Sequence, residues 1–210
     1  MSSVLQLKLV LTTQNRLNDP GIYRRIQVLD TINFYELHCI LQIAMGWSGV
    51  GSHEFRDLYD NSDIICNDFD YSSGPYGMVY DSQGYPVKGF LKHNSLSYYD
   101  YIDESDNHWL HVLFVEDVFS KEAGKQYPLC LEGEKNCPPE AFTGWDGYLE
   151  MVEGKGKLHS NYLKLSGSAY DPNSFNLEQV NTSLLNWKEF KQHWLDIKNQ
   201  LEGKHPSPLQ

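Results

Sequence analysis

The chain has few positive charges and no long apolar runs. Its 210 residues carry 28 acidic side chains against 17 basic ones, a formal net charge of −11, and only four of the basic ones are arginines. Because proteins bind nucleic-acid phosphates through clustered lysine and arginine, this balance argues against nucleic acid as a partner. No apolar run approaches the roughly 20 residues that span a bilayer, so no membrane insertion is expected.

Neither an export signal nor a disulfide framework is visible. The first residues lack the charged segment and apolar core of a signal peptide, so we predict a cytoplasmic protein. In that compartment the four cysteines, Cys39, Cys66, Cys130 and Cys137, are expected to be free thiols. The spacing between Cys130 and Cys137 does not fit a zinc knuckle, and no second pair completes one.

Complete catalytic motifs are also missing. The sequence contains no nucleophile elbow, P-loop, dinucleotide-binding glycine fingerprint or His-Glu-x-x-His string. The acidic stretch between Asp57 and Asp70 lacks the spacing, central glycine and closing glutamate of a calcium loop. We therefore expect no cofactor and leave enzymatic activity open.

The patterns that are present predict a single α+β domain. Alternation of apolar and polar residues is clearest over residues 4–12, where every second residue from Leu5 to Leu11 is leucine. Such alternation is typical of a half-buried strand. The predicted strands form an antiparallel or mixed sheet and cover residues 4–12, 22–28, 53–59, 97–102 and 109–116.

Two helices are predicted beside the sheet. Asn33 and Glu36 have the spacing of a capping box, apolar residues then recur at helical spacing, and Gly46 can end the helix, which gives a helix over 34–45. A second apolar stripe, which includes Trp187 and Trp194, predicts an added helix over 187–202. Residues 60–88 look irregular, with a possible hairpin formed by 79–80 and 85–87.

The most distinctive string of the sequence runs from Cys130 to Tyr148. It contains two adjacent prolines, Pro138 and Pro139, together with glycines and aromatic residues. We interpret it as a rigid loop that aromatic packing holds in place, and as neither helix nor strand.

Three stretches together resemble one protein family. They are residues 20–26, residues 37–55, and Trp109-Leu110-His111 followed by residues 130–148. In this order they resemble the ORF-3-like proteins first named from a root-inducing plasmid, also called transposon passenger proteins. The resemblance implies an ORF-3-like α+β domain over residues 1–152 and a C-terminal extension over 153–210, whose helix packs on the same domain.

Six residues are candidates for a binding site. Tyr23, Arg24, Trp47 and Trp109 have the chemistry to stack a planar ligand or to bind an anion. The alternative interpretation is that the tryptophans belong to the core and that Arg24 pairs with one of the many carboxylates.

His111 and Glu140 complete this candidate set. We expect the loop Pro138-Pro139-Glu140 to meet the strand that carries Trp109 and His111, with His111 and Glu140 in one cleft that solvent can reach. The alternative is that the loop only closes the end of the sheet.

Three histidines are weak candidates for a metal site. His38, His53 and His111, with Asp106 or Glu140 as a carboxylate, are residue types that hold a divalent metal which activates water. Their long spacings do not establish proximity, and the family's His-Leu-His triplet is Gly51-Ser52-His53 in this chain. We therefore predict no metal site.

The family resemblance and the missing motifs lead to one functional prediction and one alternative. We expect a non-catalytic binding or accessory protein associated with mobile elements, whose partner is a protein or a small-molecule ligand. The alternative is a metal-dependent hydrolase that acts through His38, His53 and His111.

Overall fold

Eight strands form one mixed sheet in the computed structural model of the protein. The model describes residues 2–12, 21–49, 52–57, 64–66, 79–89, 95–101, 108–140, 144–154, 160–162, 164 and 170–202. The strands are β1 (Ser3–Thr12), β2 (Tyr23–Leu29), β3 (His53–Asp57), β4 (Ile64–Cys66), β5 (Val79–Asp81), β6 (Ser95–Tyr101), β7 (His108–Ser120) and β8 (Leu129–Glu134). Their order across the sheet is β5-β4-β3-β6-β7-β1-β2-β8.

The centre of the sheet follows from the leucine alternation of β1. This strand pairs antiparallel with β2 on one side and with β7 on the other. Leu5, Leu7, Leu9 and Leu11 all point into the core and are buried. The strands predicted over residues 97–102 and 109–116 correspond to β6 and β7, which pair antiparallel.

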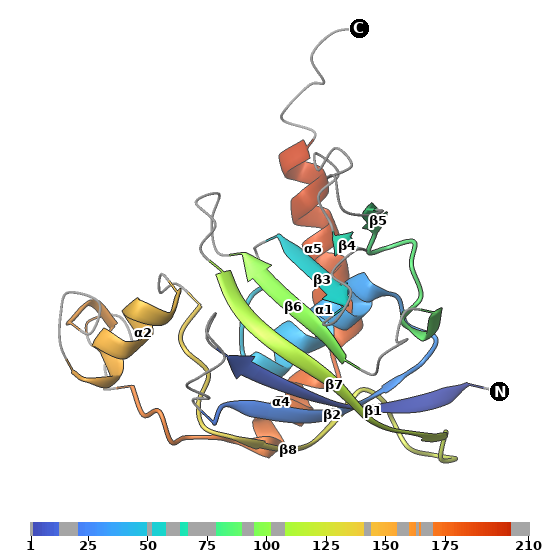
Figure 1. The fold of residues 1–210 in the computed structure, drawn as a ribbon, viewed down its shortest axis with the longest axis horizontal. Coiled ribbons are helices and arrows are strands. Elements are labelled where there is room, and N and C mark those ends of the chain that lie inside the picture. The colour runs from blue at the N-terminus through green and yellow to red at the C-terminus, as the bar shows by residue number, and fades with distance from the viewer. Residues whose placement is uncertain are drawn as a thin grey trace, which may run out of the picture.

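Helix α1 (Phe34–Met45) covers the inner face of this sheet, as Figure 1 shows. The side chain of Asn33 accepts a hydrogen bond from the Glu36 backbone, and the Glu36 carboxylate accepts one from the Asn33 backbone, so the predicted capping box is present. Gly46 ends the helix in the left-handed conformation, with φ at 80°.

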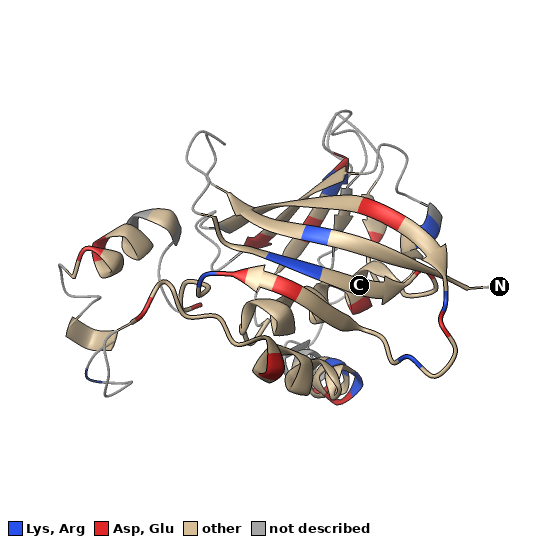
Figure 2. Cartoon of the chain, turned by 90° about the horizontal axis from the view of Figure 1, so that it is seen from below, with Lys and Arg blue, Asp and Glu red and all other residues tan. Residues whose placement is uncertain are grey.

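Two further helices lie on the same side of the sheet as α1. They are α4 (Leu177–Leu184) and α5 (Trp187–Glu202), which lie behind the strands in Figure 1 and below the sheet in Figure 2. Leu184 and Trp187 are buried at the junction of the two helices. Helix α5 is tied to α1 by an ion pair of 2.7 Å between Lys191 Nζ and Glu36 Oε1.

Strand β8 pairs with β2 along one edge, and on its outer edge a side chain takes the place of a further strand. Asn181 of α4 accepts a hydrogen bond from the Cys130 backbone nitrogen at 2.8 Å, and its amide nitrogen donates to the Cys130 carbonyl oxygen at 2.9 Å. The amide of Asn181 thus makes the two hydrogen bonds that a neighbouring strand would make.

Two expectations from the sequence are wrong, and one predicted strand is longer than expected. The string from Cys130 to Tyr148 is not only a loop, because β8 takes up its beginning and α2 (Gly144–Val152) its end. Residues 79–80 and 85–87 do not form a hairpin: β5 pairs parallel with β4, and Val87–Gly89 is the short 3-10 helix η1. The strand predicted over 109–116 continues to Ser120. Residues 58–59 and 102, the expected strand ends, lie outside the described residues.

The chain is an α+β domain, as predicted, with one helix layer against a largely antiparallel sheet. Helix α4 was not predicted, because only Leu177, Val180 and Leu184 supply an apolar pattern over its eight residues. In the described part of the chain, no helix combines the length and apolar character that a membrane crossing requires.

Candidate functional site

The three histidines singled out from the sequence lie in the core between α1 and the sheet, where His38 stacks on His53 and His111 packs against Tyr98. The register of β3, β6 and β7 places His53, Asp100 and Trp109 in one cross-strand row. The next row contains Tyr98 and His111. Because side chains alternate along a strand, both rows point to the inner face, where α1 supplies His38 and Gln42. We call His38, Gln42, His53, Tyr98, Asp100 and His111 the histidine cluster.

A directional chain of hydrogen bonds joins α1 to β6 in this cluster. Gln42 Nε2 donates to the Tyr98 hydroxyl oxygen at 2.8 Å, and that hydroxyl lies 2.7 Å from His38 Nδ1. The hydrogen bond of His38 with the Gly49 backbone raises the His38 pKa, as a ring N–H donated to a carbonyl oxygen does, and this leaves Nδ1 to accept the Tyr98 hydroxyl hydrogen. His38 is therefore a neutral imidazole that carries its proton on Nε2.

Burial sets the protonation of the cluster. It lowers the pKa of His38 to about 3, against an opposing contribution from a hydrogen bond with the Gly49 backbone. Burial also lowers the pKa of His111 to about 3, opposed by weaker contacts with the backbone of Tyr98 and Trp109. For Asp100 burial has the opposite effect and raises the pKa to about 7. Near neutral pH the imidazoles of His38 and His111 are uncharged, whereas Asp100 titrates.

The expectation that His111 faces a solvent-accessible cleft is wrong. Its side chain is 0% exposed, and its ring packs edge-on against Trp47 with centroids 5.5 Å apart. Trp47 in turn stacks on Trp109, with ring centroids 5.8 Å apart. Both tryptophans are buried, which agrees with the alternative that they belong to the core.

Glu140 anchors a loop near this cluster. Its two carboxylate oxygens accept hydrogen bonds from the backbone nitrogens of Ser48 and Gly49, at 2.7 and 2.9 Å. The Trp47 indole nitrogen donates to the Pro138 carbonyl oxygen at 2.7 Å, and the Trp194 indole nitrogen donates to the Ser48 carbonyl oxygen. Residues 47–49 are thus held by the 138–140 segment on one side and by α5 on the other.

The geometry of the histidines does not suit a shared metal. The rings of His38 and His53 are stacked, with centroids 3.9 Å apart and planes 15° apart. The lone pair of an imidazole nitrogen lies in the plane of the ring. Because the two ring planes are stacked and nearly parallel, the lone pairs of His38 and His53 do not point toward one metal ion between them. Across the described ranges, no three His, Cys, Asp or Glu side chains are placed to hold a metal ion. Asp106, the other candidate carboxylate, lies outside those ranges.

Arg24 lies in a different part of the core, on the inner face of β2. Its side chain is 3% exposed, and all five of its N–H groups donate to neutral acceptors. These acceptors, at 2.7 to 3.1 Å, are the carbonyl oxygens of Tyr23, Ala44, Glu134 and Lys135 and the sulfur of Cys137. Among the described residues Arg24 has no carboxylate partner, contrary to the alternative weighed from the sequence.

A pocket of about 310 Å³ opens beside Arg24, between the C-terminal end of α1 and helix α4. The ring of Phe175 forms part of its wall and lies over the guanidinium group, 4.4 Å from the guanidinium carbon to the ring centroid. The other lining residues mix apolar and uncharged polar groups: Ile43, Ala44, Met45, Gly46, Asn136, Ser174, Asn176, Gln179, Val180 and Ser183. We call this the Arg24 pocket.

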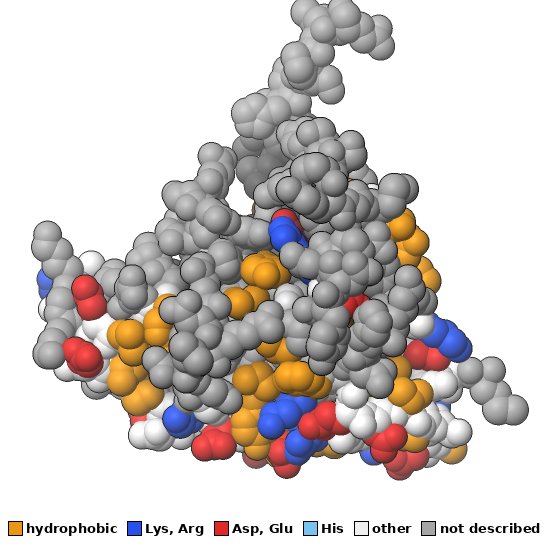
Figure 3. Space-filling view, viewed as in Figure 1, with side chains coloured by type: hydrophobic (Ala, Val, Ile, Leu, Met, Phe, Trp, Pro, Cys, Tyr) orange, Lys and Arg blue, Asp and Glu red, His pale blue; other side chains and the backbone are white. Residues whose placement is uncertain are grey.

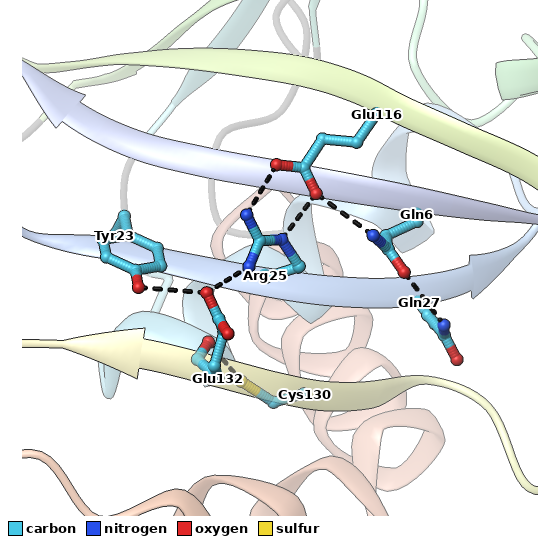
Figure 4. A network of polar contacts seen from close by, with 7 residues as sticks. All are labelled: Gln6, Tyr23, Arg25, Gln27, Glu116, Cys130 and Glu132. Carbon is cyan, nitrogen blue, oxygen red and sulfur yellow. Dashed lines mark hydrogen bonds and ion pairs between the residues drawn. The ribbon is translucent and has the colours of Figure 1, made fainter.

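Tyr23 lies on the opposite, outer face of the sheet, in the polar network of Figure 4. Its hydroxyl donates to Glu132 at 3.0 Å, and this hydrogen bond raises its pKa. Arg25 also contacts Glu132 and makes a bidentate pair with Glu116, at 2.5 and 2.8 Å. Figure 3 shows charged side chains of both signs along this lower part of the surface.

The predicted site residues therefore separate into three places. Trp47, Trp109, His111 and Glu140 come together at the histidine cluster, Arg24 lines the pocket, and Tyr23 belongs to the outer face. Sequence reasoning missed Asp100 and Tyr98, although the alternation of Leu96, Tyr98 and Asp100 already places them on one face of a strand.

Comparisons with known proteins agree with this architecture. The family model of plasmid pRiA4b ORF-3-like proteins matches residues 3–179 of the chain, and so continues past residue 152 into α4. The uncharacterized protein y4hQ of Sinorhizobium fredii is 28% identical over 189 residues, which cover 88% of this chain and 92% of that protein.

A solved structure shares the fold. The crystal structure of MM3350, a protein of unknown function from Methanosarcina mazei, superposes with a TM-score of 0.69 at 24% sequence identity. The superposition covers 85% of this chain and 97% of that chain. At this level of identity the likeness shows the fold alone.

Proposed function

The chain belongs to the family of plasmid pRiA4b ORF-3-like proteins, and we propose that it is a non-catalytic protein that binds a small molecule in the Arg24 pocket. The relatives reported above are uncharacterised, so the proposal is drawn from the geometry of this chain. The pocket carries this proposal. Its volume of about 310 Å³ lies at the lower end of the range for ligand sites, and it mixes apolar walls with a few polar groups.

The contrast with the histidine cluster supports binding over catalysis. His38 and His111 are buried and uncharged, and His38 is already engaged by Tyr98. A general base or metal ligand must reach its substrate or ion, and these side chains are turned into the core. The alternative of a metal-dependent hydrolase thus has less support from the geometry than small-molecule binding has.

A pair of variants on α4 tests the binding site. Ser183 and Thr182 are adjacent and both exposed, but only Ser183 lines the pocket. Ser183→Leu should fill the pocket and remove the binding of small fragments, detected by ligand-observed NMR, while Thr182→Leu should leave it intact. Fragment binding that survives Ser183→Leu would place the ligand site elsewhere and refute the proposal.

A separate assay tests the hydrolase alternative. The full-length chain is supplied with Zn²⁺, Mn²⁺ or Mg²⁺ and with model esters and phosphoesters. We expect no turnover above the metal-only blank. Turnover that EDTA stops and that His53→Gln abolishes would overturn the non-catalytic assignment.

We extend the proposal to an accessory role for mobile elements, which the plasmid in the family's name supports. The test is the transfer frequency of a plasmid that carries the gene, compared with the same plasmid carrying the Ser183→Leu allele. We expect a lower frequency with the variant. If Ser183→Leu abolishes fragment binding but leaves the transfer frequency unchanged, ligand binding has no role in plasmid transfer and the accessory role is refuted.

A further inference from the structure

We infer that the Arg24 pocket takes a small organic anion with an apolar body, such as a monocarboxylate, an inference that rests on the proposed function. Three features of the pocket carry it: the charge of its lining, the bonding of Arg24, and the character of its other side chains.

The charge of the lining is unusual for this chain. The whole sequence has 28 acidic residues against 17 basic ones. The described residues that line the pocket nevertheless include one arginine and no aspartate or glutamate. A cationic ligand would be repelled by Arg24 there, whereas an anion would meet this positive charge at short range.

Within the described part of the chain, the charge of Arg24 has no carboxylate as counter-ion. Buried charges are normally paired, because the loss of hydration must be offset by an opposite charge or by many dipoles. Here four carbonyl oxygens and the sulfur of Cys137 take the N–H groups. That sulfur is a neutral thiol, since burial raises the pKa of Cys137 to about 11. The pocket is the open space next to this cation, whose charge is offset by dipoles but paired with no described carboxylate.

The remaining lining fits an anion that also has an apolar part. Because every N–H of Arg24 is engaged, the guanidinium group attracts an anion by charge, and other donors must bind its oxygens. Uncharged donors are available in the side chains of Asn176, Gln179 and Ser183, while Met45 and Val180 supply apolar contact. The small volume limits the ligand to about one ring or a short chain.

Three probes of one shape and different charge test this inference. Benzoate, benzamide and benzamidine carry charges of −1, 0 and +1 on the same ring. Each is titrated into the ¹⁵N-labelled full-length chain, and the amide signals of Gly46, Gln179 and Ser183 are followed. We expect benzoate to bind roughly tenfold more tightly than benzamide, as one partly solvated charge allows, and benzamidine to bind most weakly. High salt should reduce the preference for benzoate over benzamide, because it screens the charge of Arg24.

A matched pair of charge variants sharpens the result. Ser183→Asp places a carboxylate in the pocket lining and should reverse the order of benzoate and benzamidine, whereas Thr182→Asp adds the same charge to the same helix outside the lining and should preserve it. Equal or tighter binding of benzamide at these amides would overturn the anion class and leave small-molecule binding intact. If none of the three probes moves these signals, both the anion class and the proposed function fail.

Discussion

Gly133 lies directly opposite Arg24 in the register of β2 and β8. A side chain at Gly133 would place its Cβ 2.7 Å from Phe175 Cζ and 2.8 Å from Arg24 Cδ, closer than real Cβ contacts come. The glycine therefore makes room for Phe175 over the guanidinium group. Its role is steric, and it maintains one wall of the Arg24 pocket.

Gly133→Ala should displace Phe175 from Arg24. We expect a loss of about 1–3 kcal/mol in the free energy of unfolding, the usual range for an overpacked site, and weaker benzoate binding. The measurement is urea denaturation followed by tryptophan fluorescence. Gly84→Ala is the control, because a Cβ there would meet only the Asp81 carbonyl oxygen at 3.7 Å. Equal unfolding midpoints for the two variants would contradict the steric role.

Asp100→Asn should stabilise the protein at alkaline pH. Burial raises the pKa of Asp100 from 3.8 to about 7, so between these values the unfolded chain loses a proton that the folded chain keeps. Stability therefore falls as pH rises through this window, by up to about 4 kcal/mol. Asparagine does not ionise, and its advantage should be large at pH 8 and vanish near pH 4. Exposed Asp117→Asn is the control, and a pH-independent effect of Asp100→Asn would refute the titration.

His111→Phe should make the protein more resistant to acid. Burial lowers the pKa of His111 from 6.5 to about 3, so below pH 6.5 the unfolded chain binds a proton that the folded chain excludes. This stability is present at neutral pH and is lost as pH falls toward 3. Phenylalanine removes the titration and keeps the contact with Trp47, so the acid-unfolding midpoint in circular dichroism should move to lower pH. His193→Phe, at an exposed position of α5, should leave it unchanged.

Glu140→Ala should release residues 48–49 without unfolding the domain. The carboxylate accepts two backbone hydrogen bonds, and hydrogen bonds to a charged group contribute roughly 1.5–3 kcal/mol each. We expect faster hydrogen exchange at the Ser48 and Gly49 amides, measured by NMR, and unchanged exchange in β1. Glu150→Ala, an exposed position on α2, serves as the control. Unchanged protection of both amides would show that the anchoring by Glu140 is not required.

Local patterns predicted the parts of the fold that depend on neighbours in the chain. The alternation from Leu5 to Leu11 identified the central strand, and the capping box of Asn33 and Glu36 identified the start of α1. The resemblance to the family is likewise confirmed by the match over residues 3–179. The strand and helix signals each lie within a few residues, where backbone geometry links sequence to structure directly.

The pocket could not be predicted in this way. Arg24 and Phe175 are 151 positions apart in the sequence numbering, and nothing local to either residue indicates their contact. The string after Cys130 misled for a similar reason: its glycine at position 133 looks like a loop residue, but it lies inside β8 because Phe175 needs the space. The burial of His111 could not be predicted either, because Trp47, which packs on its ring, comes from another segment of the chain.

The pairing of Asn181 with Cys130 has a consequence for how copies of this chain behave toward one another. An unprotected outer strand offers backbone groups that recruit strands from other molecules, which is a common route to aggregation. At β8 the amide of Asn181 already occupies both groups of Cys130, and α4 stands where an incoming strand would lie. Helix α4, which borders the Arg24 pocket, therefore also prevents a strand of another molecule from pairing with β8.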